Sequence, residues 1–300
     1  MRIAVTGATG FVGGHLLPQL IGAGHQVNAL TRRPQADRPG VTWVAGALDN
    51  EDALARLCEN CDAVIHVAGV VNAADAAGFD AGNRLGTLAM LHAAEAAGTK
   101  RFVHISSLAA REPQLSMYGA SKRAAEDAVV KSSLDWRVVR PTGIYGPGDT
   151  EMLDMFRMAK HGVVALPPAG RMSLIHVQDL AHLILALVET PDGALFYEAD
   201  DGQPGGWAYR DFAAALGQAF GRKVIALPIP KLLLSATSAL DRLFRGNKAI
   251  LTPDRVGYLT HPDWTIDTAR QVPADLWTPK IPTAEGLAQT AKWYVDNRWL

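Results

Sequence analysis

The first half of the chain alternates short apolar runs with longer segments in which apolar residues recur every three or four positions. Short apolar runs bounded by turn residues predict buried strands, and the longer periodic segments predict helices. The predicted strands are Ile3–Thr6, Gln26–Leu30, Thr42–Val44, Ala63–Val67, Phe102–Ser106 and Trp136–Arg140. The predicted helices between them are Phe11–Ile21, Asn50–Cys58, Asn83–Ala97 and Met117–Lys131.

This alternation predicts an α/β fold, a doubly wound parallel sheet of the Rossmann type, because right-handed crossovers cover both faces of such a sheet with helices. After Arg140 the pattern changes to a stretch rich in proline and glycine, followed by further elements. These are a helix over Met152–His161, a strand over Met172–His176 and a helix over Asp179–Glu189. We therefore expect a cofactor domain over residues 1–150, to which 172–192 return. A smaller C-terminal α+β substrate lobe is expected over 151–171 and 193–300.

The second lobe contains most of the aromatic residues and an amphipathic segment, Lys231–Arg245. Most of the aromatic side chains are expected to pack in the core of this lobe. The segment predicts a helix, which we interpret as packed on the protein rather than as a membrane anchor.

The composition adds limits on the class of protein. The chain has 300 residues, 48% of them hydrophobic, and a net charge of −1, which fits a soluble protein with a large core. A nucleic-acid or membrane-surface partner usually requires a basic patch, so neither is expected. The first strand is predicted within the first few residues, which leaves no room for a secretory signal, and no apolar run reaches spanning length. We expect a cytoplasmic protein with a small-molecule substrate.

Two cysteines, Cys58 and Cys61, have the spacing C-x-x-C. A structural zinc site needs four ligands, and a thioredoxin-like pair opens a helix, whereas this pair ends one. We interpret both cysteines as packing residues. The nine histidines lack ligand spacing, so no metal site is expected.

The most informative segment directly follows the first strand. Gly7, Gly10 and Gly13 have the spacing G-x-x-G-x-x-G and open a predicted helix. Such glycines permit a tight turn, the approach of backbone to a pyrophosphate, and close packing of helix on sheet. The segment predicts a dinucleotide site, although glycines that serve the turn geometry alone are the alternative.

Tyr118 and Lys122 lie four residues apart on a predicted helix and therefore share a face. A nearby ammonium lowers the pKa of a phenol, which can then exchange a proton with a carbonyl or hydroxyl group during hydride transfer. Ser106 and Ser107 end the fifth strand, where ligands bind in open α/β sheets. We assign a structural role to Ser106 and a substrate contact to Ser107.

The second strand ends in Thr31-Arg32-Arg33. An acidic residue here is typical of NAD sites, because it binds the ribose 2′-hydroxyl, whereas an arginine suits the 2′-phosphate of NADP. We therefore expect NADP, with NAD possible, and Arg32 as its contact. Two solvated arginines are the alternative interpretation.

With these motifs identified, the chain resembles the extended or atypical branch of the short-chain dehydrogenase/reductase superfamily. The resemblance rests on the glycine turn, His66-Val-Ala-Gly69, Asn83 to Thr87, the Ser106-Ser107 motif, Tyr118-x-x-x-Lys122, Arg140 to Gly148 and Ile175 to Leu180. It implies Tyr118 as general acid/base, Lys122 as the residue that lowers its pKa and binds the nicotinamide ribose, and Ser107 as the residue that holds the reacting oxygen. The cofactor contacts that it implies, with the residues above, are Gly7, Thr9, Gly10, Phe11, Val12, Gly13, Arg32, Leu48, Ala68, Gly69, Tyr118, Lys122, Pro141 and Ile144.

Some positions depart from the family pattern. Ala47 and Leu48 follow Gly46 where an acidic residue is common, and Gly143 replaces an asparagine that nucleotide-sugar epimerases tend to carry. Leu108-Ala-Ala110 replaces the acidic pair of sugar dehydratases.

The resulting hypothesis is an NADP-dependent oxidoreductase that transfers hydride between the nicotinamide and a small carbonyl or secondary alcohol. One alternative is a nucleotide-sugar epimerase with tightly held NAD. Another is a non-catalytic NADPH-binding protein resembling the accessory subunit of respiratory complex I. The resemblance also implies a possible homodimer through Asn83–Ala97 and Met117–Lys131.

Overall fold

The structure is a computed structural model and describes residues 1–191, 193–245 and 252–300. Its contacts divide it into two compact units. The first unit comprises Met1–Arg140, Leu180–Glu198 and Val272–Trp277. The second comprises Pro141–Asp179, Ala199–Gln271 and Thr278–Leu300. The roles of cofactor domain and substrate lobe stay predictions for these units.

A seven-stranded sheet forms the centre of the first unit, with the strand order β11-β6-β5-β4-β1-β2-β3. Strands β1 to β6 pair in parallel. This is the predicted Rossmann-like α/β fold. The bounds are Arg2–Thr6 (β1), Gln26–Thr31 (β2), Val41–Ala45 (β3), Ala63–His66 (β4), Arg101–Ile105 (β5), Asp135–Pro141 (β6) and Leu195–Ala199 (β11).

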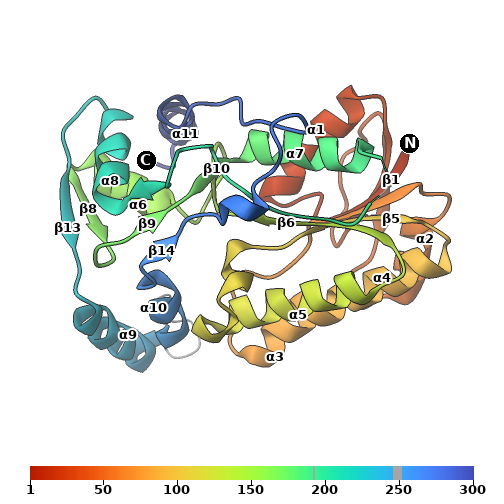
Figure 1. The fold of residues 1–300 in the computed structure, drawn as a ribbon, viewed down its shortest axis with the longest axis horizontal. Coiled ribbons are helices and arrows are strands. Elements are labelled where there is room, and N and C mark those ends of the chain that lie inside the picture. The colour runs from red at the N-terminus through yellow and green to blue at the C-terminus, as the bar shows by residue number, and fades with distance from the viewer. Residues whose placement is uncertain (192, 246–251) are drawn as a thin grey trace. The chain divides into compact units, whose positions relative to one another are not determined.

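Helices cover both faces of this sheet. In Figure 1, α1 and α7 lie on one face and α2, α4 and α5 on the other. The bounds are Phe11–Gly22 (α1), Glu51–Cys58 (α2), Ala76–Phe79 (α3), Gly86–Ala96 (α4), Met117–Lys131 (α5) and Val177–Glu189 (α7). A π-helical segment, η1 (Asp80–Leu85), joins α3 to α4, and a 3₁₀ turn, η2 (Leu108–Arg111), follows β5.

The predicted helix Asn83–Ala97 therefore begins earlier than expected. The Asp75 side chain accepts a hydrogen bond of 2.8 Å from the Gly78 N–H, which caps the new start. Helix α5, in contrast, has the predicted bounds. Its start is fixed by Ser116, whose hydroxyl accepts the Gly119 N–H at 2.9 Å.

The second unit contains short sheets and helices. Its strands are Gly143–Tyr145 (β7), Val163–Leu166 (β8), Arg171–Met172 (β9), Leu174–His176 (β10), Trp207–Ala208 (β12), Ile225–Pro228 (β13) and Asp263–Trp264 (β14). Its helices are Leu153–Lys160 (α6), Tyr209–Gln218 (α8), Lys231–Arg245 (α9), Pro253–Leu259 (α10) and Thr283–Asp296 (α11). The predicted strand Met172–His176 is divided into β9 and β10, because β9 pairs with β12 and β14 whereas β10 pairs with β7.

Each unit has its own apolar core. In the first, the buried strand residues Val64, Phe102 and Val138 pack with Leu54 and Met90 from α2 and α4. In the second, the main aromatic cluster is formed by Phe156, Phe212 and Tyr294, with Trp293 and Trp299 against it. These aromatic side chains pack in the core of their own unit, as expected.

Candidate active site

The glycine turn joins β1 to α1 at the carboxyl end of the sheet. Gly7 has φ +72°, and a Cβ atom on it would lie 2.7 Å from the backbone nitrogen of Ala68. A Cβ on Gly13 would collide with the Gly7 carbonyl oxygen. Gly10 is the N-cap of α1 and has no side chain with which to cap its N–H groups. The turn is therefore a backbone cradle at the start of a helix, and it fits a dinucleotide pyrophosphate.

The loop after β4 is held against this turn by polar contacts. The Thr6 hydroxyl accepts the Ala68 N–H at 3.2 Å and lies 2.7 Å from Nδ1 of His66. Nε2 of His66 is 3.1 Å from the Thr87 hydroxyl. These contacts place Ala68 and Gly69, both predicted cofactor contacts, beside the glycine turn.

Asn83, in η1, connects this loop to α5. Its Oδ1 accepts the Val70 N–H at 2.8 Å, and its Nδ2 donates to the Val70 carbonyl at 3.0 Å and to the Ser121 hydroxyl at 2.8 Å. A Cβ on Gly69 would lie 2.8 Å from Asn83 Oδ1 and 3.8 Å from Lys122 Nζ. The sequence placed Asn83 only at a helix start, because the π-helical segment that directs it inwards has no apolar periodicity of its own.

The two serines after β5 have different environments. Ser106 is buried and donates a hydrogen bond of 2.5 Å to Glu126 Oε1. Ser107 is half-buried, and its hydroxyl oxygen accepts the Ala109 N–H at 3.2 Å, which starts η2. Accepting this N–H does not use the hydroxyl hydrogen of Ser107, so that hydrogen can be donated to another oxygen.

Lys122 is 5% exposed, and its ammonium donates a hydrogen bond of 2.7 Å to the Ile105 carbonyl at the end of β5. Burial lowers its pKa to about 8, against the opposing effect of Glu126. His66 and His104 stack nearby, with ring centroids 5.6 Å apart. Burial, followed by the charge of Lys122, lowers the pKa of both rings, that of His66 to about 3. The rings are therefore neutral at pH 7, and Lys122 carries the positive charge.

Tyr118 is half-buried, one helical turn before Lys122 on α5. Its ring centroid lies 6.1 Å from that of Phe79. The start of α5 packs closely on η2, since a Cβ on Gly119 would lie 2.7 Å from the Ala109 carbonyl oxygen. This contact brings the turn that carries Ser107 against the turn of α5 that carries Tyr118.

A buried ion network lies behind Lys122. Arg140 donates to both oxygens of Glu126, at 2.8 and 2.7 Å, and to Glu198 at 3.2 Å. All three side chains are at most 6% exposed. Glu126 follows Lys122 by four residues and so lies on the same face of α5.

The remaining predicted cofactor residues lie as follows. Arg32 is exposed and directly follows β2, which pairs with β1, so it lies at the same edge of the sheet as the glycine turn. Thr9 is exposed, whereas Phe11 and Val12 are half-buried in the first turn of α1. Leu48 packs on the core and against Gly86. Pro141 ends β6 and Ile144 lies in β7, and both belong to the second unit.

The cysteine pair lies away from these residues. Both side chains are buried and free, and burial raises the pKa of Cys58 to about 12 and that of Cys61 to about 11. The Cys61 thiol donates to the Leu57 carbonyl at 3.3 Å and accepts from Asn28 at 3.4 Å. Thiols held in this state are poor nucleophiles and poor metal ligands.

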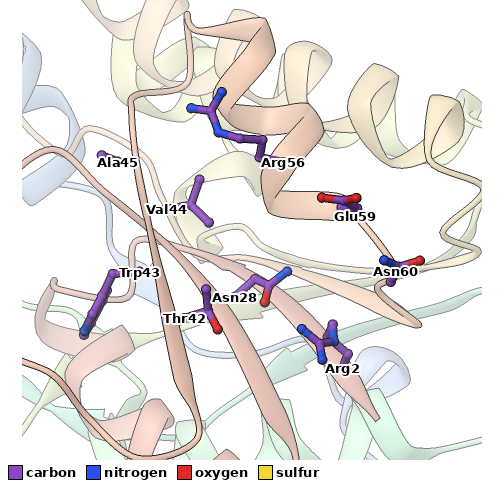
Figure 2. A pocket seen from close by; sticks show the side chains of 9 residues that line it. All are labelled: Arg2, Asn28, Thr42, Trp43, Val44, Ala45, Arg56, Glu59 and Asn60. Atoms are coloured by element: carbon purple, nitrogen blue, oxygen red, sulfur yellow. The ribbon is translucent and has the colours of Figure 1, made fainter.

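A surface pocket of about 510 Å³ lies between the end of α2 and strands β1 to β3 (Figure 2). It is lined by Arg2, Asn28, Thr42, Trp43, Val44, Ala45, Arg56, Glu59 and Asn60. None of the predicted site residues belongs to this lining. In the described parts of the chain, no three His, Cys, Asp or Glu side chains form a group that could hold a metal ion. Within those same ranges, no helix is long and apolar enough to cross a bilayer.

Comparisons with known proteins identify the family and the fold. Residues 3–198 match the model of the "NAD dependent epimerase/dehydratase family". A ceramide reductase of Caulobacter vibrioides is 37% identical over 99% of this chain and 96% of that protein. A 4-hydroxy-2-methyl-3-oxo-4-farnesyl-3,4-dihydroquinoline-1-oxide ketoreductase of Stigmatella aurantiaca is 31% identical over 68% of this chain and 69% of that protein. The solved structure of MoeE5 in complex with UDP-glucose and NAD has a TM-score of 0.77 at 21% identity, over 99% of this chain and 100% of MoeE5, which shows a shared fold.

Proposed function

This chain belongs to the NAD dependent epimerase/dehydratase family and is an NAD(P)-dependent oxidoreductase, and from that premise we propose that it uses NADPH to reduce a ketone carried by an apolar, lipid-like molecule. The observation that carries the proposed reaction is the buried Lys122, anchored to the Ile105 carbonyl one helical turn after Tyr118. The substrate class is supported by the ceramide and farnesylated quinoline of the two named relatives.

In the proposed reaction, NADPH bound at the glycine turn supplies the hydride. Tyr118 donates a proton to the carbonyl oxygen of the substrate as that oxygen gains negative charge. The ammonium of Lys122 stabilises the tyrosinate that is left behind. The Ser107 hydroxyl donates a hydrogen bond to the same substrate oxygen. This bond holds the carbonyl in place and stabilises the developing charge.

The preference for NADP is supported by the position of Arg32. Arg32 directly follows β2, at the edge of the sheet where the ribose of the adenosine half binds in dinucleotide folds. A guanidinium there can make charge-assisted hydrogen bonds to a 2′-phosphate.

The decisive experiment replaces Tyr118 by phenylalanine and follows NADPH oxidation with a panel of long-chain and short-chain ketones. Removing the proton donor should reduce turnover about 10²- to 10⁴-fold, with NADPH affinity nearly unchanged. Tyr197→Phe makes the same chemical change in β11 and should keep full activity. A Tyr118→Phe enzyme with normal turnover would exclude this role, and activity confined to short-chain ketones would exclude the lipid-like substrate class.

The epimerase alternative is disfavoured by the surroundings of Gly143. A Cβ at this position would lie 3.0 Å from Leu174 Cδ2 and 3.1 Å from Met152 Cε, so an asparagine has little room. The non-catalytic alternative is disfavoured by the buried charge of Lys122, since burying an ammonium lowers stability and a purely structural site has no use for it. NAD that co-purifies with the protein, and does not exchange, would instead favour epimerisation.

A further inference from the structure

Large apolar side chains are exposed close together in the second unit. Ile225 is 64% exposed, Leu227 44%, Leu232 84% and Leu233 51%. All four lie in one nine-residue stretch that runs from β13 into α9, visible at the lower left of Figure 1. Clustered exposed apolar residues mark interaction sites far more often than single ones do.

Strand β13 presents its apolar residues outwards. Among the described residues it pairs only with β8, in a two-stranded sheet. Ile225 and Leu227 lie on one face because side chains alternate along a strand, and that face is the exposed one. Ala226, on the opposite face, packs against the core of the unit.

Helix α9 also exposes apolar residues. Leu232, Ala236 and Ala239 follow the i, i+4, i+7 spacing of a single helix face, and all three are exposed. Ser238 is 1% exposed, and its hydroxyl has no hydrogen-bond partner among the described residues. The helix packs against α10, and among its described side chains Ser238 is buried whereas Leu232 and Leu233 are exposed. Clustered exposed apolar residues of this kind suit contact with an apolar partner.

The charged residues within this stretch of the chain have one sign. Arg222, Lys223 and Lys231 are all exposed and flank the apolar residues. From Phe212 to Leu240 the sequence contains no aspartate or glutamate, although the whole chain has a net charge of −1. Apolar residues beside basic ones suit the boundary between acyl chains and anionic headgroups.

We propose that β13 and the first half of α9 form an interfacial docking surface for an anionic lipid bilayer. The leucines and Ile225 enter the acyl boundary, and the three basic residues contact the headgroups. The helix lies in the plane of the membrane and does not cross it. This interaction is independent of the proposed hydride transfer.

A second copy of the chain is a poorer occupant. A two-fold interface would bring the same patch of two copies together and gather Arg222, Lys223 and Lys231 of both copies in one interface. Repulsion between like charges would oppose such contact, whereas an anionic lipid surface neutralises them.

The test measures co-sedimentation of the full-length protein with vesicles, without substrate or cofactor. One set of vesicles is phosphatidylcholine alone, and the other contains phosphatidylglycerol as well. Binding is expected to the second set and should weaken as salt rises. The double substitution Leu232→Ser and Leu233→Ser should reduce the partition coefficient at least about tenfold. Because both side chains are already exposed, thermal unfolding should stay unchanged.

A matched control replaces two exposed valines outside the patch, Val130→Ser and Val295→Ser, which are 43% and 47% exposed. This control should bind vesicles as the unchanged protein does. The proposal is overturned if the protein binds to neither set of vesicles, or if the leucine and valine double variants bind equally well. It is also overturned if sedimentation equilibrium shows a dimer that only the leucine substitutions dissociate. Since no reaction is measured, failure of the proposed reductase activity would leave this result unaffected.

Discussion

The ammonium of Lys122 donates a hydrogen bond of 2.7 Å to the carbonyl oxygen of Ile105, the last residue of β5. This bond fixes a cation at the carboxyl end of β5, directly before the two serines and one helical turn after Tyr118 on α5. The chemistry proposed for the site depends on that cation.

The reaction should therefore lose rate in alkaline solution. The pKa of Lys122 is about 8, so the residue is cationic below this pH and neutral above it. NADPH-dependent reduction should fall as the pH rises through about 8. Lys122→Arg retains its charge and should move the fall to higher pH, whereas Lys131→Arg at the exposed end of α5 should leave the profile unchanged. If the unchanged enzyme and both variants had the same pH profile, the fall in rate could not be assigned to Lys122.

Two adjacent glycines of α1 should respond differently to alanine. A Cβ on Gly13 would collide with the Gly7 carbonyl, whereas a Cβ on Gly14 would meet nothing within 4 Å. Gly13→Ala should weaken NADPH binding by more than about 100-fold, because the turn must open. Gly14→Ala should retain binding and raise the free energy of unfolding by about 0.5–1 kcal/mol. Fluorescence titration measures NADPH binding, and urea denaturation measures the free energy of unfolding. Equal NADPH affinities of the two variants would show that the glycine turn is not the binding site.

Arg32 should determine the choice between the two nicotinamide cofactors. Arg32→Ser should weaken NADPH binding about 10- to 100-fold, since a hydrogen bond to a charged group contributes about 1.5–3 kcal/mol. NADH affinity should stay the same. Arg33→Ser is the matched control, and a larger loss in that variant would transfer the role to Arg33.

Removing Arg140 should destabilise the first unit strongly. Glu126 and Glu198 would stay buried and lose their ion pairs with Arg140, although Glu198 keeps a contact of 3.7 Å with Arg111, and breaking such a buried pair costs about 3–5 kcal/mol. The exposed pair Arg123–Asp127 gives the comparison, and Arg123→Met should cost about 0–1 kcal/mol. Chemical denaturation compares the two substitutions. Equal losses would mean that the network is not desolvated in solution.

Much of the fold could be predicted from the sequence because the first half of the chain is strongly periodic. Helix α5 has the bounds that its periodicity predicts, and the six predicted strands are present within a residue or two. Strand β11 was not predicted, since it comes from a distant segment, Leu195–Ala199, and joins the sheet beside β6. Pairing between distant segments leaves no local signal in the sequence.

The candidate site was predicted by residue type more than by geometry. The glycines, and the pair Tyr118 and Lys122, have fixed spacings along the sequence. Residues this close in sequence lie within one turn or helix, so their relative placement can be predicted. The contacts of Asn83 and Glu126 depend on which side chains the fold brings together, so only the structure reveals them. Ser106 was assigned only a structural role, and its hydroxyl bond to the Glu126 carboxylate could not be predicted.

The π-helical segment Asp80–Leu85 also restricts which insertions and deletions this chain can tolerate. A π-helical turn holds one residue more than an α-helical turn, and shortening it by one residue would give a more regular helix from Ala76 to Ala96. Each residue lost also rotates one part of the helix against the other by about 100° around the helix axis. Asn83 would then turn away from Val70 and Ser121. Homologues that retain this site should vary in length on either side of the segment but not within it.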